Sequence, residues 1–312
     1  MNSSTPGAGT LAALSNDLAD AVARVSRSVI AIHARRRIPS SGVIWREGIV
    51  VTADHTITRD EDISITLPDG STTAATLAGR DSSTDIAVLR VDTTAAAPEP
   101  APDDQLQVGR LVLAVGRPGT QVTASLGIVS AVGGEWRTWR GGRIDRFIRL
   151  DLTVYDGFSG SPLVDTGGRV LGLNTSGLSR AAALALPNTT VNRIVDELIH
   201  RGRIARGFFG IAVQPVRLPE PMRRQLGLDA TVGLVIISLE SDGPANRAGL
   251  LLGDIITGLD GRDVSDPSDI LAFLASDAIG KEVSFRIVRA GAGKTVPVTV
   301  GERPSREERR SR

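Results

Sequence analysis

The sequence predicts a mainly β protein in which a pair of β-barrels is followed by a smaller α+β domain. From Val29 to Leu186, short strand-like runs alternate with turns that contain Gly, Asp or Pro, as expected for barrels built from many short strands. From Gly207 the pattern changes, and a helix with an apolar face is expected near residues 267–275. A length of 312 residues suits about two domains.

The first elements are expected in the following order. Residues 1–14 open with small and polar residues and are expected to be disordered. A helix follows from Ser15 to Arg27, with Ser15 as its cap and apolar residues on one face. This helix and the two barrels form a first domain, residues 15–203.

A second helix closes that domain. Residues 192–200 carry apolar side chains at helical spacing, and Gly202 stops the helix. The linker that follows, residues 204–206, is too short to let the next domain move far. Residues 207–301 form the second domain, and the basic tail, residues 302–312, is expected to be disordered.

Composition excludes several classes of protein. The net charge is +1 and aromatic residues make up 3%, so neither favours nucleic-acid binding. The chain has no cysteine, which excludes disulfides, thiolate metal sites and a cysteine nucleophile. No apolar run reaches the length of a signal sequence or a membrane span. We therefore expect a cytoplasmic protein.

The most informative segment is Gly157-Phe158-Ser159-Gly160-Ser161-Pro162. It places Ser159 on a glycine-flanked turn before an apolar strand, which is how a nucleophilic serine is usually presented. A serine hydroxyl is weak at neutral pH, so it needs a base, an orienting carboxylate and donors for an oxyanion.

The candidate base is His55. It follows the apolar strand 49–51, where a side chain can face a cleft, although a histidine in such a turn can also be a plain surface residue. His33 lies at the end of an alternating strand, and His200 ends a helix where it complements the helix dipole. Both are better explained by structural roles.

The candidate carboxylate is Asp85, which opens the apolar run Ile86 to Val91. A buried carboxylate there would hold the imidazole tautomer and stabilise the imidazolium. Asp81 is the competitor, and its polar turn suggests that it is solvated or paired with Arg80.

The order along the chain separates the known triad folds. His55, Asp85 and Ser159 follow the histidine, aspartate, serine order of the chymotrypsin-like double barrel, whereas subtilisins and α/β-hydrolases use other orders. The spacing places the first two residues on one six-stranded barrel and the serine on a second.

The first two hundred residues resemble a trypsin-like serine protease of the HtrA/Deg type. The matching segments are Ser41 to Ile44, Val51 to His55, Ala75 to Asp81, Thr84 to Leu89, Gly116 to Pro118, Ser125 to Ser130 and the serine loop. The family's serine loop usually reads Gly-Asn-Ser-Gly-Gly-Pro, so Phe158 and Ser161 depart from it. A serine at position 161 is tolerable if that position does not need a positive φ angle.

The resemblance implies further site residues. The backbone N–H groups of Gly157 and Ser159 would form the oxyanion hole. Thr153 stands where trypsin-like enzymes that select basic side chains carry an aspartate, so specificity for Arg or Lys is not expected. By the same resemblance, a specificity pocket that includes Thr153, Tyr155 and Thr175 should take a medium aliphatic side chain. No metal or organic cofactor is implied, and exported proteins are common in the family.

Residues 133–146 stand apart because they are rich in Gly, Trp and Arg. A loop with Trp136 and Trp139 corresponds either to the family's regulatory sensor loop or to a trimer contact. It can equally be a long hairpin with two packed indoles.

From Gly207 the chain resembles a PDZ domain, through Phe208-Phe209-Gly210-Ile211, Gly243 to Leu250 and Gly253 to Ile256. The resemblance implies that the loop Phe208 to Ile211 binds a C-terminal carboxylate and that the peptide adds as a strand. The facing helix, about Pro267 to Ala275, would present its apolar side chains, which are Ile270, Leu271 and Leu274.

These observations lead to an ATP-independent endopeptidase that cleaves unfolded or misfolded proteins. Its expected partners are unfolded polypeptides and C-terminal peptides, and the resemblance implies a homotrimer formed through N-terminal segments. The alternative is a catalytically inactive adaptor or holdase, suggested by Phe158 and Ser161.

Overall fold

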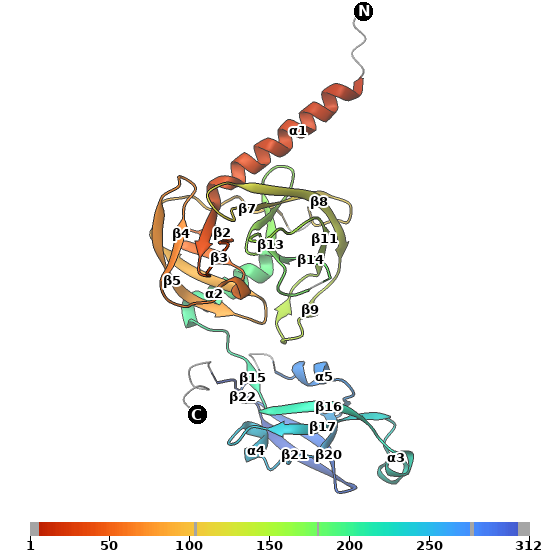
Figure 1. Ribbon diagram of the computed structural model, residues 1–312. Helices are drawn as coiled ribbons and strands as arrows, with labels where there is room; N and C mark the ends of the chain where they lie inside the picture. Colours follow the sequence, from red (N-terminus) through yellow and green to blue (C-terminus); the bar gives the residue numbers. More distant parts are fainter. Residues whose placement is uncertain (1–5, 103–104, 180, 275–277, 305–312) are drawn as a thin grey trace, which may run out of the picture. The chain divides into compact units, whose positions relative to one another are not determined.

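The computed structural model describes residues 6–102, 105–179, 181–274 and 278–304. The chain divides into two compact units between Ile204 and Ala205 (Figure 1). Residues 305–312 of the expected tail, and Ala275 at the end of the expected helix, lie outside the described residues.

Each of the two barrels in the first unit closes from six strands, which confirms the predicted mainly β fold. The first barrel has the strand order β1-β2-β3-β6-β5-β4. Its strands are β1 (Val29–His33), β2 (Ser40–Arg46), β3 (Ile49–Thr52), β4 (Ile63–Thr66), β5 (Thr72–Asp81) and β6 (Ile86–Val91). Alternate Ile, Val, Leu and Ala side chains fill the interior, because successive residues of a strand face opposite sides.

The second barrel has the order β11-β14-β13-β12-β7-β8. Its strands are β7 (Leu111–Gly116), β8 (Thr123–Val132), β11 (Ile148–Asp151), β12 (Pro162–Val164), β13 (Val170–Thr175) and β14 (Ala183–Pro187). A two-stranded hairpin of β9 (Trp136–Arg137) and β10 (Arg143–Ile144) extends from the connection between β8 and β11. The segment rich in Gly, Trp and Arg therefore forms a hairpin, but only Trp136 is packed, edge-on against Phe147, whereas Trp139 is 70% exposed.

The N-terminal helix α1 (Pro6–Val25) begins earlier than the sequence suggested. Residues 6–14, expected to be disordered, are helical in the structure. The alanines and leucines between Ala8 and Leu14 are strong helix formers, which explains the extension. The 3₁₀ turn η1 (Ser26–Ser28) then leads into β1. Ala21 and Val25 are buried against the second barrel.

Helix α2 (Asn188–Arg201) closes the first unit. Its apolar face packs on both barrels through Val191, Ile194, Val195 and Leu198. Gly202 ends it with φ 70° and donates to the carbonyl of Leu198 at 2.9 Å, as the sequence predicted for this position.

The second unit contains a β-sheet of five consecutively paired strands, a short sixth strand at its side, and short helices. The strands β16 (Ile211–Arg217), β17 (Val232–Leu239), β18 (Ile255–Leu259), β20 (Glu282–Arg289) and β21 (Ala292–Thr299) lie in that order, and β19 (Arg262–Asp263) pairs with β18. A separate pair joins β15 (Gly207–Phe208) to β22 (Gly301–Glu302). The helices are α3 (Glu220–Leu226), α4 (Pro244–Arg247) and α5 (Pro267–Leu271).

Candidate active site

The candidate base, His55, lies in the 3₁₀ turn η2 (Asp54–Thr56) that follows β3. Antiparallel pairing of β3 with β6 places the end of β3 beside the start of β6, where Asp85 lies. His55 Nδ1 is 2.8 Å from Oδ2 and 3.0 Å from Oδ1 of Asp85, and the His55 amide donates to Oδ1 at 2.9 Å. The structure therefore brings these two sequence-predicted residues together.

Asp85 is held more firmly than the sequence implied. Its side chain is 4% exposed, and its φ of 60° is a left-handed conformation that Asp tolerates better than most residues. The Thr175 hydroxyl also donates to Oδ2. Donors from His55 and Thr175 satisfy the buried carboxylate and fix its orientation toward the imidazole.

Asp81, the competing carboxylate, is not solvated as we expected. It is 5% exposed and accepts hydrogen bonds from the Ser83 amide at 3.2 Å, the Ser83 hydroxyl at 2.7 Å and the Thr84 hydroxyl at 2.7 Å. These bonds shape the turn that leads to Asp85. Sequence reasoning missed this role because an Asp-Ser-Ser turn looks the same whether exposed or buried.

Arg80 supports the His55 segment and does not act mainly on Asp81. It donates to the Asp54 carboxylate, to Asp60 at 2.6 Å and to the Ile57 carbonyl at 2.9 Å. Burial by itself lowers the pKa of Arg80, but its hydrogen bonds to the carboxylates of Asp54 and Asp60, and their negative charges, outweigh this and raise it. The guanidinium therefore stays charged and fixes the turn that carries His55.

The serine loop depends on two left-handed glycines. Gly157 has φ 88° and Gly160 has φ 89°. A Cβ on Gly157 would lie 2.6 Å from Cβ of Pro118 and 2.8 Å from the Pro39 carbonyl oxygen, so only glycine fits. The backbone at Ser161 does not adopt a positive φ angle. The condition for tolerating a serine there is met.

Both departures from the family motif have local partners. Ser161 Oγ accepts a hydrogen bond from Asn174 Nδ2 at 3.1 Å. Phe158 is fully buried and packs edge-on against Tyr155, with ring centroids 5.3 Å apart. The Phe158 ring also lies against Gly116, where a Cβ would be 2.8 Å away. Apolar packing thus anchors the loop at position 158.

Ser159 lies on this loop with 5% of its surface exposed. Its hydroxyl forms hydrogen bonds with the Ser176 hydroxyl at 2.9 Å and with the Ser176 amide at 3.2 Å. Among the described residues, no hydrogen bond joins the Ser159 hydroxyl to His55. From the sequence, Ser176 was expected only as part of a pocket-lining strand, residues 172–176, and its contact with Ser159 was not foreseen.

The backbone around Ser159 carries the two amides that the sequence predicts as oxyanion donors. The Gly157 carbonyl points into the protein and accepts from the Ser41 amide at 2.8 Å and the Ser41 hydroxyl at 2.6 Å. Within the described part of the chain, the amides of Gly157 and Ser159 donate to no protein group. Two unused N–H groups beside a serine hydroxyl can hold a developing negative charge.

The expected pocket residues separate into two groups. Thr153 is exposed and Tyr155 is 52% exposed, so both lie on the surface just before the serine loop. Thr175 is fully buried and donates to Asp85. Thr175 therefore orients the Asp85 carboxylate and does not line the specificity pocket, contrary to the expectation from the sequence. Residue type alone could not decide which face of β13 carries Thr175.

The other two histidines have structural partners. His33 Nε2 lies 2.8 Å from the Thr66 hydroxyl, and His200 Nδ1 lies 2.7 Å from the carbonyl of Asp196 in the preceding turn. Both observations agree with the structural roles expected from the sequence. Among the described residues, no group of three or more His, Asp or Glu side chains is arranged to hold a metal ion.

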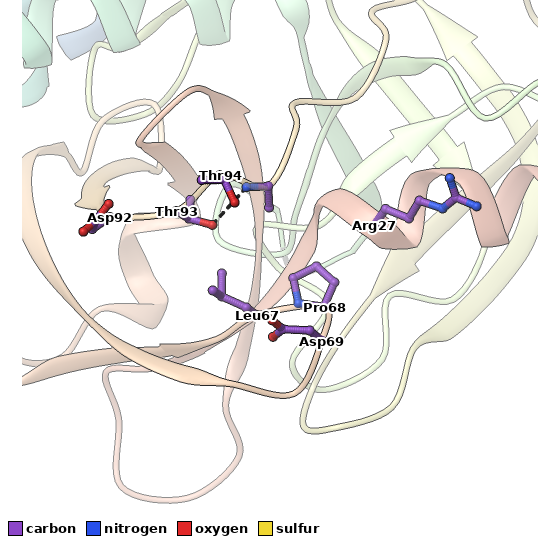
Figure 2. Close-up of a pocket in the computed structure, with 8 residues that line it drawn as sticks. Arg27, Leu67, Pro68, Asp69, Asp92, Thr93 and Thr94 are labelled. Atoms are coloured by element: carbon purple, nitrogen blue, oxygen red, sulfur yellow. Dashed lines mark hydrogen bonds between the residues drawn. The ribbon is translucent and has the colours of Figure 1, made fainter.

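A depression of about 410 Å³ lies elsewhere on the first barrel (Figure 2). Figure 2 shows Arg27, Leu67, Pro68, Asp69, Asp92, Thr93 and Thr94 around it. Asp92 follows the last residue of β6, whereas Asp85 precedes the first. The depression is therefore at the opposite end of this strand from the His55 and Asp85 pair.

In the second unit, the predicted peptide-binding loop joins β15 to β16. Phe208 is half-buried, whereas Phe209 is 1% exposed and packs edge-on against Phe285 at 4.8 Å. Gly210 has φ 78°, and among the described residues the amides of Phe209 and Gly210 donate to no protein group. The half-buried Ile211 then begins β16, an edge strand of the sheet.

The facing helix α5 is shorter than predicted and ends at Leu271. Ile270 is 5% exposed and belongs to the core, so it does not line a groove. Leu271 is half-buried, and Leu274, beyond the helix, packs partly against the core while its carbonyl accepts from the Gly207 amide at 3.1 Å. The Asp266 capping box fixes where α5 starts, but its short apolar stretch did not reveal where it ends.

Comparison with known families agrees with this geometry. Residues 40–173 match the trypsin-like peptidase domain, and residues 207–300 match the PDZ domain. The two matches fall on the first and the second unit, respectively.

Curated relatives share most of this chain. The probable periplasmic serine endoprotease DegP-like of Brucella suis biovar 1 (strain 1330) is 36% identical over 287 residues, which cover 88% of this chain and 54% of the relative. Protease Do-like 1, chloroplastic, of Arabidopsis thaliana is 34% identical over 286 residues, covering 85% of this chain and 64% of the relative. The chain thus spans less than two thirds of these relatives.

The cytoplasmic location expected from the sequence is wrong by this comparison. Relatives from Brucella suis, Rhizobium meliloti and Halomonas elongata are described as probable periplasmic serine endoproteases. The absence of cysteine did not discriminate, because a fold held by packing alone needs no disulfide in either compartment. No helix in the described part of the chain is long and apolar enough to span a membrane.

Solved structures match over nearly the whole chain. The HtrA-type protease AlgW with a decapeptide has a TM-score of 0.70 at 30% identity, and the match covers 92% of this chain and 99% of that one. The serine endoprotease from Yersinia pestis has a TM-score of 0.71 at 28% identity, covering 92% and 98%. The chain belongs to the HtrA/Deg family of trypsin-like serine endoproteases and carries one PDZ domain after its protease domain.

Proposed function

We propose that this protein cleaves unfolded polypeptides without ATP, with Ser159 as nucleophile, His55 as general base and acid, and Asp85 as the orienting carboxylate. The observation that carries this proposal is the His55 and Asp85 pair, bonded at 2.8 Å, beside a serine on a glycine-flanked loop. The inactive adaptor is not favoured, because the chain carries all three side chains that a triad needs and both motif departures have local partners.

The first step requires the Ser159 hydroxyl to turn from Ser176 toward Nε2 of His55. Hydrogen bonds of this kind are often formed only once substrate binds. Oγ then attacks the scissile carbonyl while His55 takes the hydroxyl proton, and Asp85 stabilises the resulting imidazolium without becoming protonated. The carbonyl oxygen becomes an oxyanion.

The oxyanion is stabilised by the amides of Gly157 and Ser159. Removing one donor of this kind costs about 3–4 kcal/mol in related chemistry. Collapse of the tetrahedral intermediate breaks the peptide bond, and His55 returns the proton to the leaving amine. Water, deprotonated by His55, then releases the acyl group and regenerates the serine.

The acyl side of the substrate would contact the segment before the serine loop. Thr153 and Tyr155 are exposed there and neither is a carboxylate that would select a basic side chain, which supports the expected preference for a medium aliphatic side chain. Profiling the bonds cleaved in casein by mass spectrometry tests this preference.

The PDZ domain would bind C-terminal peptides. The unused amides of Phe209 and Gly210 can donate hydrogen bonds to a carboxylate, and the open edge of β16 can pair with the peptide as a further strand. Phe208, Ile211, Leu271 and Leu274 would contact its side chains. The decapeptide and tripeptide in the AlgW structures are consistent with peptide recognition in such proteins.

Assembly and location complete the proposal. The proposed homotrimer forms through the N-terminal segment, where Leu11 is 70% and Leu14 is 37% exposed on α1. Light scattering of the purified protein tests that state. We place the protein in the periplasm on the descriptions of its relatives, and cell fractionation tests that location.

The decisive test is labelling with a fluorophosphonate, which reacts with activated serines. Wild-type protein should be labelled and should degrade casein without ATP, whereas Ser159→Ala should do neither while keeping its melting temperature. Ser161→Ala, next to the same turn, is the matched control and should still be labelled. Absence of labelling in the wild type, with and without casein, would overturn the proposal.

A further inference from the structure

The connection between β1 and β2 carries three consecutive arginines, Arg35, Arg36 and Arg37. Arg35 folds back and donates to the carbonyls of Ile38 and Pro39. Arg36 and Arg37 are exposed, and among the described residues neither forms a hydrogen bond or an ion pair. The anchored Arg35 thus holds a short loop that presents two unpaired cations to solvent.

This loop lies between the segments that carry the proposed base and nucleophile. On one side, the amide and hydroxyl of Thr58, three residues after His55, donate to the Ala34 carbonyl at 3.2 Å and 2.8 Å. On the other side, the Pro39 carbonyl lies close enough to Gly157 that a Cβ there would be 2.8 Å away. The arginine loop is therefore fixed beside the catalytic groups.

The direction of the substrate decides which part of it reaches the loop. The acyl side lies toward the 153–155 segment and the end of β13, where Gly177 packs so closely that a Cβ would be 2.6 Å from Nδ1 of His55. The leaving amine receives its proton from His55 and departs on the other side. An extended substrate therefore continues from the scissile bond past Gly157 and Pro39.

The path passes charges of both signs, because the exposed carboxylates Glu61 and Asp62 lie on the same connection as Arg59. Arg36 and Arg37 come three and two residues before Pro39, so they are at most about 10 Å from it along the chain. Arg59 lies beside them, since its guanidinium donates to the His33 carbonyl at 2.8 Å. Asp156, next to Gly157, is an exposed carboxylate nearby, and Asp60 is already paired with Arg80.

We infer that this loop selects substrates with acidic residues on the leaving side of the scissile bond, two to four positions after it, through Arg36 and Arg37. The inference rests on the proposed function, because it needs cleavage at Ser159. Exposed charge pairs are individually weak and are screened by salt. The expected preference for Glu over Lys is therefore about fivefold to tenfold in kcat/KM at low salt, and smaller at high salt.

The test uses the full chain and three quenched fluorescent peptides. Their acyl halves are identical and come from a bond that the protein cleaves in casein, and the leaving halves carry Glu-Glu, Gln-Gln or Lys-Lys. The double variant Arg36→Gln, Arg37→Gln should lose most of the discrimination while cleaving the Gln-Gln peptide at the wild-type rate. Arg24→Gln, Arg27→Gln removes two equal charges from the α1 and η1 region and should keep the discrimination.

The outcomes separate this inference from the proposed function. Equal rates for the three peptides, with normal fluorophosphonate labelling, would overturn the inference alone. Discrimination that survives in the Arg36 and Arg37 variant would also overturn it. Failure of the wild type to label or to cut casein would remove the proposed function and this inference together.

Discussion

The two halves of the candidate active site are held in different ways. On the first barrel, His55 and Asp85 are joined by three contacts within 3.0 Å, and Thr175 adds a further donor. On the second barrel, Ser159 is positioned by its glycine-flanked loop, and its hydroxyl is bonded to Ser176. The candidate base and carboxylate are thus bonded to each other in the structure, whereas the candidate nucleophile is bonded to Ser176.

The difference indicates where control of activity lies. A buried, hydrogen-bonded carboxylate costs free energy to disturb, so the first half should change little when substrate binds. A hydroxyl needs only rotation about one side-chain bond to change partners. We therefore expect activation to depend on the serine half.

The largest effect is expected for Asp85→Asn. The amide would orient His55 in the wrong tautomer, and kcat should fall about 10⁴-fold, as in related triads. Steady-state kinetics on a peptide substrate measure the loss. Asp81→Asn is the comparison variant, because Asp81 shapes the same turn without contacting the imidazole. If it lowered kcat equally, turn shape and not the carboxylate would be the source of the effect.

A smaller loss is expected for Thr175→Val, which keeps the shape and removes the donor to Asp85. The buried carboxylate would hold the imidazole less firmly, and kcat should fall about tenfold with KM unchanged. Thr175→Ser should restore the rate, since it restores the hydroxyl. A rise in KM with an unchanged kcat would contradict this role and would return Thr175 to substrate binding.

The smallest effect is expected for Ser176→Ala, and it is a gain in reactivity at Ser159 where the other two variants lose activity. Ser176→Ala removes the hydroxyl partner of Ser159, and a net hydrogen bond of about 0.5–1.5 kcal/mol implies a rate of fluorophosphonate labelling about two to twelve times higher. Ser179→Ala is the matched control, because Ser179 lies on the same connection and accepts from the amides of Ala181 and Ala182 instead. Slower labelling of Ser176→Ala would show that Ser176 assists the nucleophile.

Several features could be read directly from the sequence. The mainly β fold followed from the alternation of short apolar runs and turns, and the family followed from motifs spread over both barrels. The end of α2 at Gly202 also followed, because a left-handed glycine is a local signal. These features depend on neighbours a few residues apart.

Other features could not be read in this way. The start of α1 at Pro6 was obscured because polar residues precede a helix-forming run. The end of α5 was also missed, since the predicted apolar face divides between a core residue, Ile270, and the half-buried Leu271. The compartment was inferred wrongly, because residues that build two barrels do not encode where the protein resides.

By itself, the sequence determined the fold class and the order of His55, Asp85 and Ser159 along the chain. Only the tertiary structure showed that Thr175, 90 positions from Asp85, donates a hydrogen bond to that carboxylate. It also showed that the Ser159 hydroxyl is hydrogen-bonded to the Ser176 hydroxyl. The physical reason is that these partners meet through the closing of two barrels and their packing against each other. Strand pairing across the whole chain sets such contacts, and no local pattern contains them.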